Sequence, residues 1–171
     1  MLIPGIVVFA FGSPWHIKPN ILLSLIAAQN AKDMEAPIYT QRDIQFTYQQ
    51  LKMSQGKIEV TYIKEEPGKP SPTLRIARGA VRWAKENGLT CLFFACAAPR
   101  KERCRRDLEF AVKEAGMGTR IYICAELLYK KDSDWFCLDS TEPRTRNQEG
   151  FMRRERFLLA LPMFLYKIIA S

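Results

Sequence analysis

Continuous apolar runs alternate along the chain with stretches of helical periodicity. The first run, residues 5–11, ends in Gly-Ser-Pro and is typical of a strand buried on both faces of a sheet. Strands separated by helices favour right-handed crossovers and a parallel sheet covered on both sides. The pattern predicts an α/β fold: a three-layer αβα Rossmann-like sandwich with a mainly parallel sheet, followed by a C-terminal irregular and helical extension. Further strands are expected at residues 36–40, 57–65, 89–97 and 119–126, and helices at residues 18–31, 43–55, 74–87 and 100–116.

Two helices of the second half have recognisable ends or faces. Thr73 is expected to cap the helix that follows it, and Asn87-Gly88 is expected to end that helix. Apolar residues in both helices recur at the spacing of a single buried face. The expected inward-facing residues are Leu74, Ala77, Val81 and Ala84 in the first helix and Cys104, Leu108, Ala111, Val112 and Ala115 in the second.

The alternation stops near residue 126. We expect residues 126–146 to cross the surface as an irregular excursion, and the helical segment after them to be kinked or divided at Pro162. The chain is therefore predicted to form a Rossmann-like core over residues 1–125, with residues 126–171 packed on the same domain. The terminal apolar run is too short to cross a bilayer, which takes about 20 apolar residues. A homo-oligomer contact and attachment to a membrane surface remain open for it.

Composition narrows the class of protein. The chain has 171 residues, of which 47% are hydrophobic and 26% charged, as in an ordinary globular domain and unlike a disordered chain or a membrane bundle. Its five cysteines form no Cys-x-x-Cys pair and His16 is its single histidine, so no metal site is predicted. An odd number of cysteines also does not suit a secreted disulfide framework, which favours a cytoplasmic location.

The positive charge is concentrated in the second part of the chain. The net charge is +8, and residues 73–171 carry nineteen Lys or Arg against twelve Asp or Glu, whereas residues 1–72 carry seven against six. Such a surplus indicates either a phosphorylated or polyanionic partner, or nothing beyond solubility.

Five of the seven residues from 100 to 106 are basic, at the expected start of a helix. Cations there oppose the helix dipole at a cost of about 0.3–1 kcal/mol each when exposed. An anion held by free backbone NH groups and by Arg100 or Arg103 would reverse that cost. In open α/β sheets ligands bind at the carboxyl ends of the strands, which is where this segment is expected. Lys101, Arg105 and Arg106 are expected to face water.

Three short motifs resemble the YdcF/SanA/ElyC-like group of Rossmann-like proteins. "FAFGSP" is similar to that group's glycine turn after the first strand, and "EEPGKPSPTLRIA" to its Glu and Ser/Thr motif at the start of a middle helix. "FACAAPRKER" resembles its strand followed by His-x-x-Arg, with Arg103 at the family arginine. Arg100 stands where the family has histidine, and a guanidinium cannot replace a proton-transferring imidazole. "YTQRD" stands in place of the family's Gly-Gly turn.

The resemblance, together with the expected crevice, implies a small nucleotide-like or other anionic ligand, with S-adenosylmethionine among the candidate cofactors. Neither the resemblance nor the residues fix a reaction. The predicted ligand-binding residues are Gly12, Ser13, His16, Glu66, Ser71, Thr73, Arg100 and Arg103.

Two other functions stay open at this point. Basic residues recur on the middle helix at the spacing of one face and could follow a nucleic-acid backbone. Ser13 and His16 could serve a hydrolase of unknown substrate, although no Gly-x-Ser-x-Gly surrounds the serine. Neither Gly-x-Gly-x-x-Gly nor a P-loop is present, which disfavours the common routes to dinucleotide redox chemistry and ATP hydrolysis. The residues of the basic face are Arg75, Arg78, Arg82 and Lys85.

Overall fold

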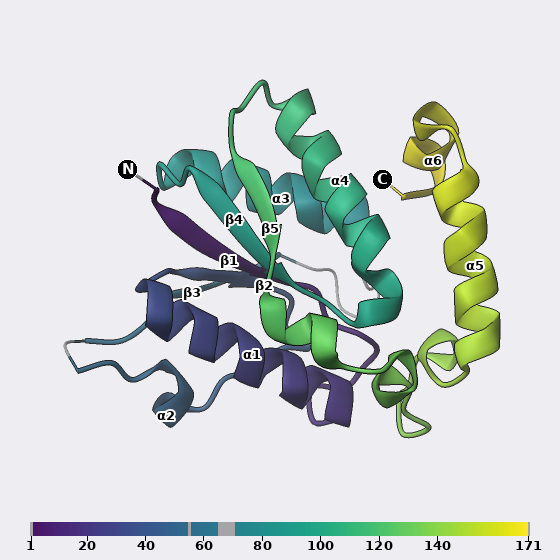
Figure 1. The fold of residues 1–171 in the computed structure, drawn as a ribbon, viewed down its shortest axis with the longest axis horizontal. Coiled ribbons are helices and arrows are strands. Elements are labelled where there is room, and N and C mark those ends of the chain that lie inside the picture. The colour runs from purple at the N-terminus through teal and green to yellow at the C-terminus, as the bar shows by residue number, and fades with distance from the viewer. Residues whose placement is uncertain (1, 55, 65–70, 171) are drawn as a thin grey trace.

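The centre of the molecule is a five-stranded parallel sheet with strand order β3-β2-β1-β4-β5 (Figure 1). The computed structural model describes residues 2–54, 56–64 and 71–170. Strands β2 and β4 flank β1, so the order changes direction there and the crevice beyond the strand ends opens at this point. The strands are β1 (Pro4–Val8), β2 (Ile38–Thr40), β3 (Val60–Tyr62), β4 (Cys91–Ala95) and β5 (Arg120–Ile123).

Helices cover both faces of the sheet, as the α/β prediction requires. On one face the core contains α1 together with Ile6 and Val8 of β1, and on the other it contains α3 and α4 together with Val7. Alternate residues of one strand thus enter different cores, which explains why its sequence is apolar throughout. The helices are α1 (Lys18–Met34), α2 (Tyr48–Leu51), α3 (Thr73–Glu86), α4 (Lys101–Glu114), α5 (Gln148–Ala160) and α6 (Met163–Ala170).

The structure corrects the expected helix of residues 43–55, which is only the single turn α2. Thr47 and Gln50 form a reciprocal capping box at its start. Its end is set where Lys52 pairs with Lys57 in an isolated antiparallel bridge, so the backbone there is extended. The strand expected at residues 57–65 is correspondingly short.

Two details of α3 and α4 also differ from expectation. Thr73 is the first residue of α3 rather than its cap, because Pro72 occupies the cap position and the threonine hydroxyl accepts a hydrogen bond from Arg103. Ala115 lies beyond the end of α4 and is exposed. The other predicted inward-facing residues are buried, and Asn87-Gly88 ends α3 as expected, with Gly88 at φ 64°.

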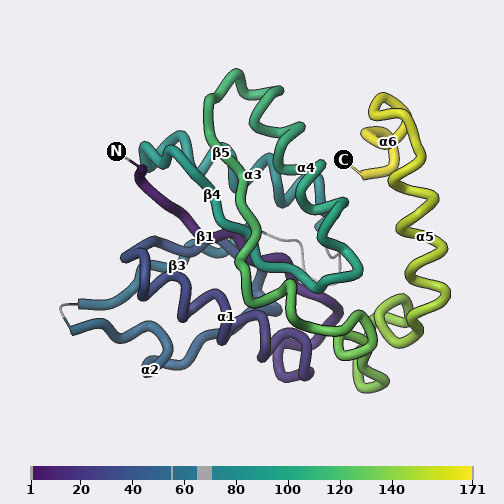
Figure 2. The backbone as a smooth tube through the Cα atoms, in the orientation of Figure 1, coloured from purple at the N-terminus to yellow at the C-terminus, as the bar shows by residue number. Residues whose placement is uncertain are grey.

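The C-terminal helices α5 and α6 lie beside α4, as the yellow ribbon in Figure 1 and the tube in Figure 2 both show. Leu158 of α5 and Tyr166 of α6 form a buried cluster with Leu74 of α3. Arg106, which was expected to face water, instead donates hydrogen bonds to the carbonyl oxygens of Leu158 and Leu159. Its guanidinium carbon lies 4.1 Å from the centre of the Tyr166 ring. The carbonyls at the end of α5 attract this cation.

No helix in the described part of the chain is long and apolar enough to cross a bilayer.

Asp107 of α4 is a buried acid within this interface. Its side chain is fully buried, and Tyr166 donates a hydrogen bond to Oδ2 over 2.6 Å. Burial raises the pKa of Asp107 to about 6, against the opposing effect of the Tyr166 hydrogen bond. The folded state therefore holds this proton more tightly than the unfolded chain does.

Stability should consequently fall between pH 4 and pH 6 as Asp107 ionises. Because its folded pKa lies above its unfolded one, the contribution is fully present below the unfolded pKa and is lost as the pH rises through the folded pKa. Relative to Asp107→Asn, which cannot titrate, the free energy of unfolding of the wild type should drop by about 3 kcal/mol across this window. Urea unfolding of both proteins at several pH values measures the difference. Parallel pH profiles would contradict the prediction.

Candidate functional site

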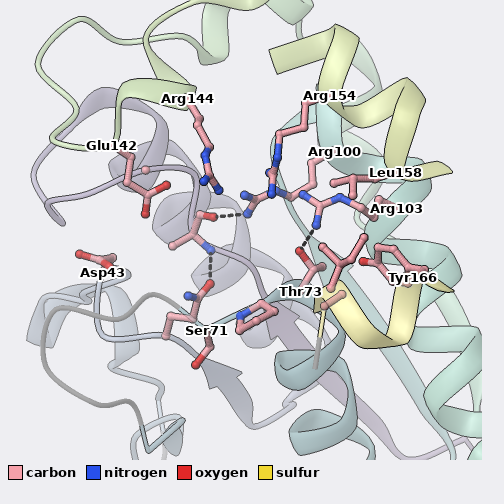
Figure 3. Close-up of a pocket in the computed structure, with 16 residues that line it drawn as sticks. Asp43, Ser71, Thr73, Arg100, Arg103, Glu142, Arg144, Arg154, Leu158 and Tyr166 are labelled. Carbon is pink, nitrogen blue, oxygen red and sulfur yellow. Dashed lines mark hydrogen bonds between the residues drawn. The ribbon is translucent and has the colours of Figure 1, made fainter. Parts of the chain in front are cut away.

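A pocket of about 200 Å³ lies at the carboxyl ends of the central strands, where the sequence predicts a ligand crevice (Figure 3). Its walls come from four parts of the chain: the end of β1 with its glycine turn, the loop after β2, the N-terminal ends of α3 and α4, and the C-terminal extension. The extension contributes residues of the irregular segment and of both α5 and α6. It therefore closes a crevice that the core alone would leave open.

The structure brings most of the predicted ligand-binding residues to this pocket. Ser13 stands beside it and donates a hydrogen bond from its hydroxyl to Asp43, a lining residue. His16 is exposed and packs edge-on against Trp15, so it is not among the lining residues. Glu66 lies outside the described residues. The predicted residues that line the pocket are Gly12, Ser71, Thr73, Arg100 and Arg103.

Both the backbone conformation at position 12 and the side chains packed against it require glycine there. Its φ of +86° lies in the region that side-chain-bearing residues rarely adopt. A Cβ at this position would lie 2.5 Å from Ser140 Oγ and 2.6 Å from Thr145 Oγ1. The turn can therefore pass beneath the C-terminal extension only with glycine here.

Arg103 is held by the extension. Its side chain is 5% exposed; Nε and Nη2 each donate to the Glu155 carboxylate over 2.7 Å, and Nη1 donates to Thr73 over 2.6 Å. Burial by itself would lower the pKa of Arg103, but the Glu155 hydrogen bonds and charge raise it above its ordinary value. Glu155 thus satisfies the cation that the sequence assigned to a ligand.

Arg100, unlike Arg103, is held by a backbone carbonyl and aromatic rings rather than by a carboxylate. Its Nη1 donates to the Ala10 carbonyl over 2.8 Å, and its guanidinium lies against the rings of Phe11 and Phe151. Its Nε is buried and has no hydrogen-bond partner among the described residues. The Ala10 carbonyl and the two rings therefore hold this guanidinium at the end of β1.

Two further arginines, Arg144 and Arg154, reach the pocket from the extension (Figure 3). Neither forms a salt bridge with any of residues 2–54, 56–64 or 71–170. The pKa of Arg154 is lowered, first by burial and then by the charges of Arg144, Arg103 and Arg100. The charge of Glu155 opposes this lowering. Cations crowded together disfavour one another's charge, and an anion placed among them would relieve this cost.

Hydrogen bonds fix the loop that carries Arg144. The backbone NH and the hydroxyl of Thr141 both donate to the Ser13 carbonyl, over 2.7 and 3.1 Å. The Ser140 hydroxyl bonds Thr145, and Arg146 Nε donates to the Ser140 carbonyl. The extension is thereby tied to the turn after β1, far away in sequence.

Acidic and amide side chains form the opposite wall. Asp43 and Glu142 both line the pocket, and Figure 3 shows their carboxylates facing the arginines across it. Gln41 accepts a hydrogen bond from the backbone NH of Ala10, which ties the loop after β2 to the end of β1. The site therefore has one strongly cationic wall and one wall that accepts hydrogen bonds.

Comparison with known proteins assigns the chain to no family. No protein-family model and no curated protein matches the chain. Among solved structures, the chain is similar to the universal stress protein from Archaeoglobus fulgidus in complex with dAMP, with 17% identity and a TM-score of 0.36 over 72% of this chain and 98% of that one. So distant a likeness bears on none of the pocket residues. The resemblance to the YdcF/SanA/ElyC-like group stays a prediction from motifs.

Proposed function

We propose that the protein binds a small phosphate-bearing or similarly charged anion in the pocket at the carboxyl ends of its strands. The observation that carries this proposal is the convergence of Arg100, Arg144 and Arg154, which have no acidic partner among the described residues. A phosphate dianion would accept hydrogen bonds from several guanidinium groups at once, and arginine matches its geometry with two parallel donors.

The size and charge of the pocket limit the ligand. Sites for drug-sized ligands usually span roughly 300–1,000 Å³, whereas this cavity measures about 200 Å³. It suits a phosphate group with a small organic part, and the base of a nucleotide would extend toward solvent. S-adenosylmethionine fits the charges less well, because it carries a sulfonium and an ammonium beside a single carboxylate.

The rival functions find less support in the geometry. Nucleic-acid binding relies on the basic face of α3, where Arg78 is bonded to Glu114 through two hydrogen bonds of 2.7 and 2.9 Å, so its charge is already compensated.

Hydrolysis relies on Ser13 and His16, which share no hydrogen bond within the described part of the chain. The Ser13 hydroxyl faces Asp43 instead. A hydrolase reaction therefore has no serine–histidine pair to rest on.

Titration with inorganic phosphate tests the proposal. A ligand that binds only the native state raises the apparent stability, by about 2.7 kcal/mol at 100 times Kd. We expect phosphate and small phosphate esters to raise Tm in a saturable manner, with one site by calorimetry, at an ionic strength held constant with chloride. A shift that chloride reproduces equally would reject the proposed site. Steep salt dependence with DNA or RNA and no saturable phosphate binding would favour the nucleic-acid alternative.

A further inference from the structure

The outer face of α6 is apolar, in contrast to an ordinary surface helix. Tyr166 and Ala170 are buried against the body of the protein. Phe164 and Ile168, one turn apart on the opposite side, are 68% and 78% exposed. A surface helix normally presents polar residues opposite its buried stripe. Here the solvent side is as hydrophobic as the docked side.

The apolar face continues onto α5. Only two residues separate the helices, so the end of α5 and the start of α6 are neighbours. Phe157 in the last part of α5 is more than half exposed, and Leu165 of α6 is also exposed. Large apolar side chains exposed together on two helices joined by so short a connection are typical of an interaction surface rather than of scattered surface hydrophobes. We call Phe157, Phe164, Leu165 and Ile168 the apolar face.

Cations accompany the apolar face. Arg153 and Arg156 lie on the exposed side of α5, with Arg156 directly before Phe157. They line a surface hollow of about 570 Å³ together with Gln148, Glu149 and Met152. Arg153 is paired with Glu149 over 3.1 Å, but both side chains are more than 80% exposed, so that pair is screened by solvent. The partner of this surface should therefore be negatively charged as well as apolar.

A second copy of the chain does not meet this requirement. A two-fold contact through the apolar face would join two surfaces that each carry Arg153 and Arg156. Like charges placed together weaken such a contact. A bilayer containing anionic lipids instead offers acyl chains for the aromatic and aliphatic side chains and phosphates for the arginines.

We propose that the outer surface of α5 and α6 docks on the surface of an anionic lipid membrane. Phe157, Phe164 and Ile168 enter the interfacial region, while Arg153 and Arg156 contact the lipid headgroups. This is attachment at the surface and involves no spanning segment. The contact uses none of the arginines that line the pocket, so it is independent of the proposed ligand binding.

Co-sedimentation of the full chain with phosphatidylcholine vesicles, with and without phosphatidylglycerol, tests the proposal. We expect binding to the anionic vesicles only. Phe164→Ser with Ile168→Ser should weaken it roughly 100-fold, and Arg153→Gln with Arg156→Gln roughly 30-fold. Tyr129→Ser with Leu138→Ser serves as the apolar control, because both residues are exposed elsewhere on the extension. Arg82→Gln with Lys85→Gln is the matched charge control on α3. Neither control should change binding.

Circular dichroism separates loss of docking from loss of folding, since the replaced side chains face solvent and should leave Tm unchanged. Absence of binding to anionic vesicles overturns the proposal, as does equal binding to neutral ones. So does binding that survives Phe164→Ser with Ile168→Ser. Sedimentation equilibrium that shows a dimer dissociated by the same substitutions would assign the surface to a second copy instead. Phosphate binding is expected to be unchanged in all these variants.

Discussion

Glu155→Ala is expected to lower the free energy of unfolding by about 3–5 kcal/mol, because it leaves the guanidinium of Arg103 buried without its counter-charge. For a chain of this size that loss corresponds to a fall in Tm of roughly 6–20 °C. The pair is buried on both sides, and two of the three hydrogen bonds of Arg103 go to this carboxylate. Thermal and urea unfolding measure the effect.

Glu149→Ala provides the matched control, because Glu149 also pairs with an arginine but in full exposure. Its removal should cost less than about 1 kcal/mol. Replacing both members of the buried pair, Arg103→Met with Glu155→Met, should recover much of the loss, since apolar residues of similar volume often substitute for a buried ion pair without cost. If Glu155→Ala proves as mild as Glu149→Ala, the pair does not hold the extension on the core.

The second large effect concerns the ligand. Arg144→Ala with Arg154→Ala should weaken phosphate binding by at least about 100-fold, because hydrogen bonds to charged groups contribute about 1.5–3 kcal/mol each. Tm without phosphate should remain unchanged or rise, since both side chains lack an ion-pair partner among the described residues and the pKa of Arg154 is lowered by its burial and its cationic neighbours. Isothermal titration calorimetry at constant ionic strength gives the affinities.

Arg82→Ala with Lys85→Ala removes the same charge from the exposed face of α3 near its C-terminal end, nine or more residues beyond Thr73 and so more than about 13 Å along the helix. It should leave phosphate affinity within about twofold, because exposed charges at that separation are screened by salt. Equal losses in both double variants would show that net charge, rather than the pocket, attracts the anion. Arg100→Ala is a less clear test, since Arg100 also holds the end of β1 through the Ala10 carbonyl.

Periodicity was sufficient to predict the layers of the fold. The apolar run of β1 required burial on both faces, and the stop signal at Asn87-Gly88 placed the end of α3. The short segments were harder to predict. Residues 43–55 have weak helical propensity, and their path depends on the pairing of Lys52 with Lys57, a contact that no local pattern indicates.

The candidate site could be predicted only from its core side. Cations at a helix start indicated Arg100 and Arg103, and the switch in strand order explains why they lie beside Gly12. The sequence could not show that Glu155, 52 positions later, would compensate Arg103. Nor could it show that the irregular segment returns to the turn after β1 and brings Arg144 into the pocket, because hydrogen bonds to the Ser13 carbonyl fix that path.

A crystal soaked in tungstate, a heavy-atom mimic of phosphate, tests the central claim most directly. The account predicts an anomalous peak inside the pocket, within hydrogen-bonding distance of the guanidinium groups of Arg144 and Arg154 and beside Arg100, and displaced by added phosphate. Anomalous peaks only at the exposed arginines of α3 or α5, with no peak in the pocket, would contradict this claim.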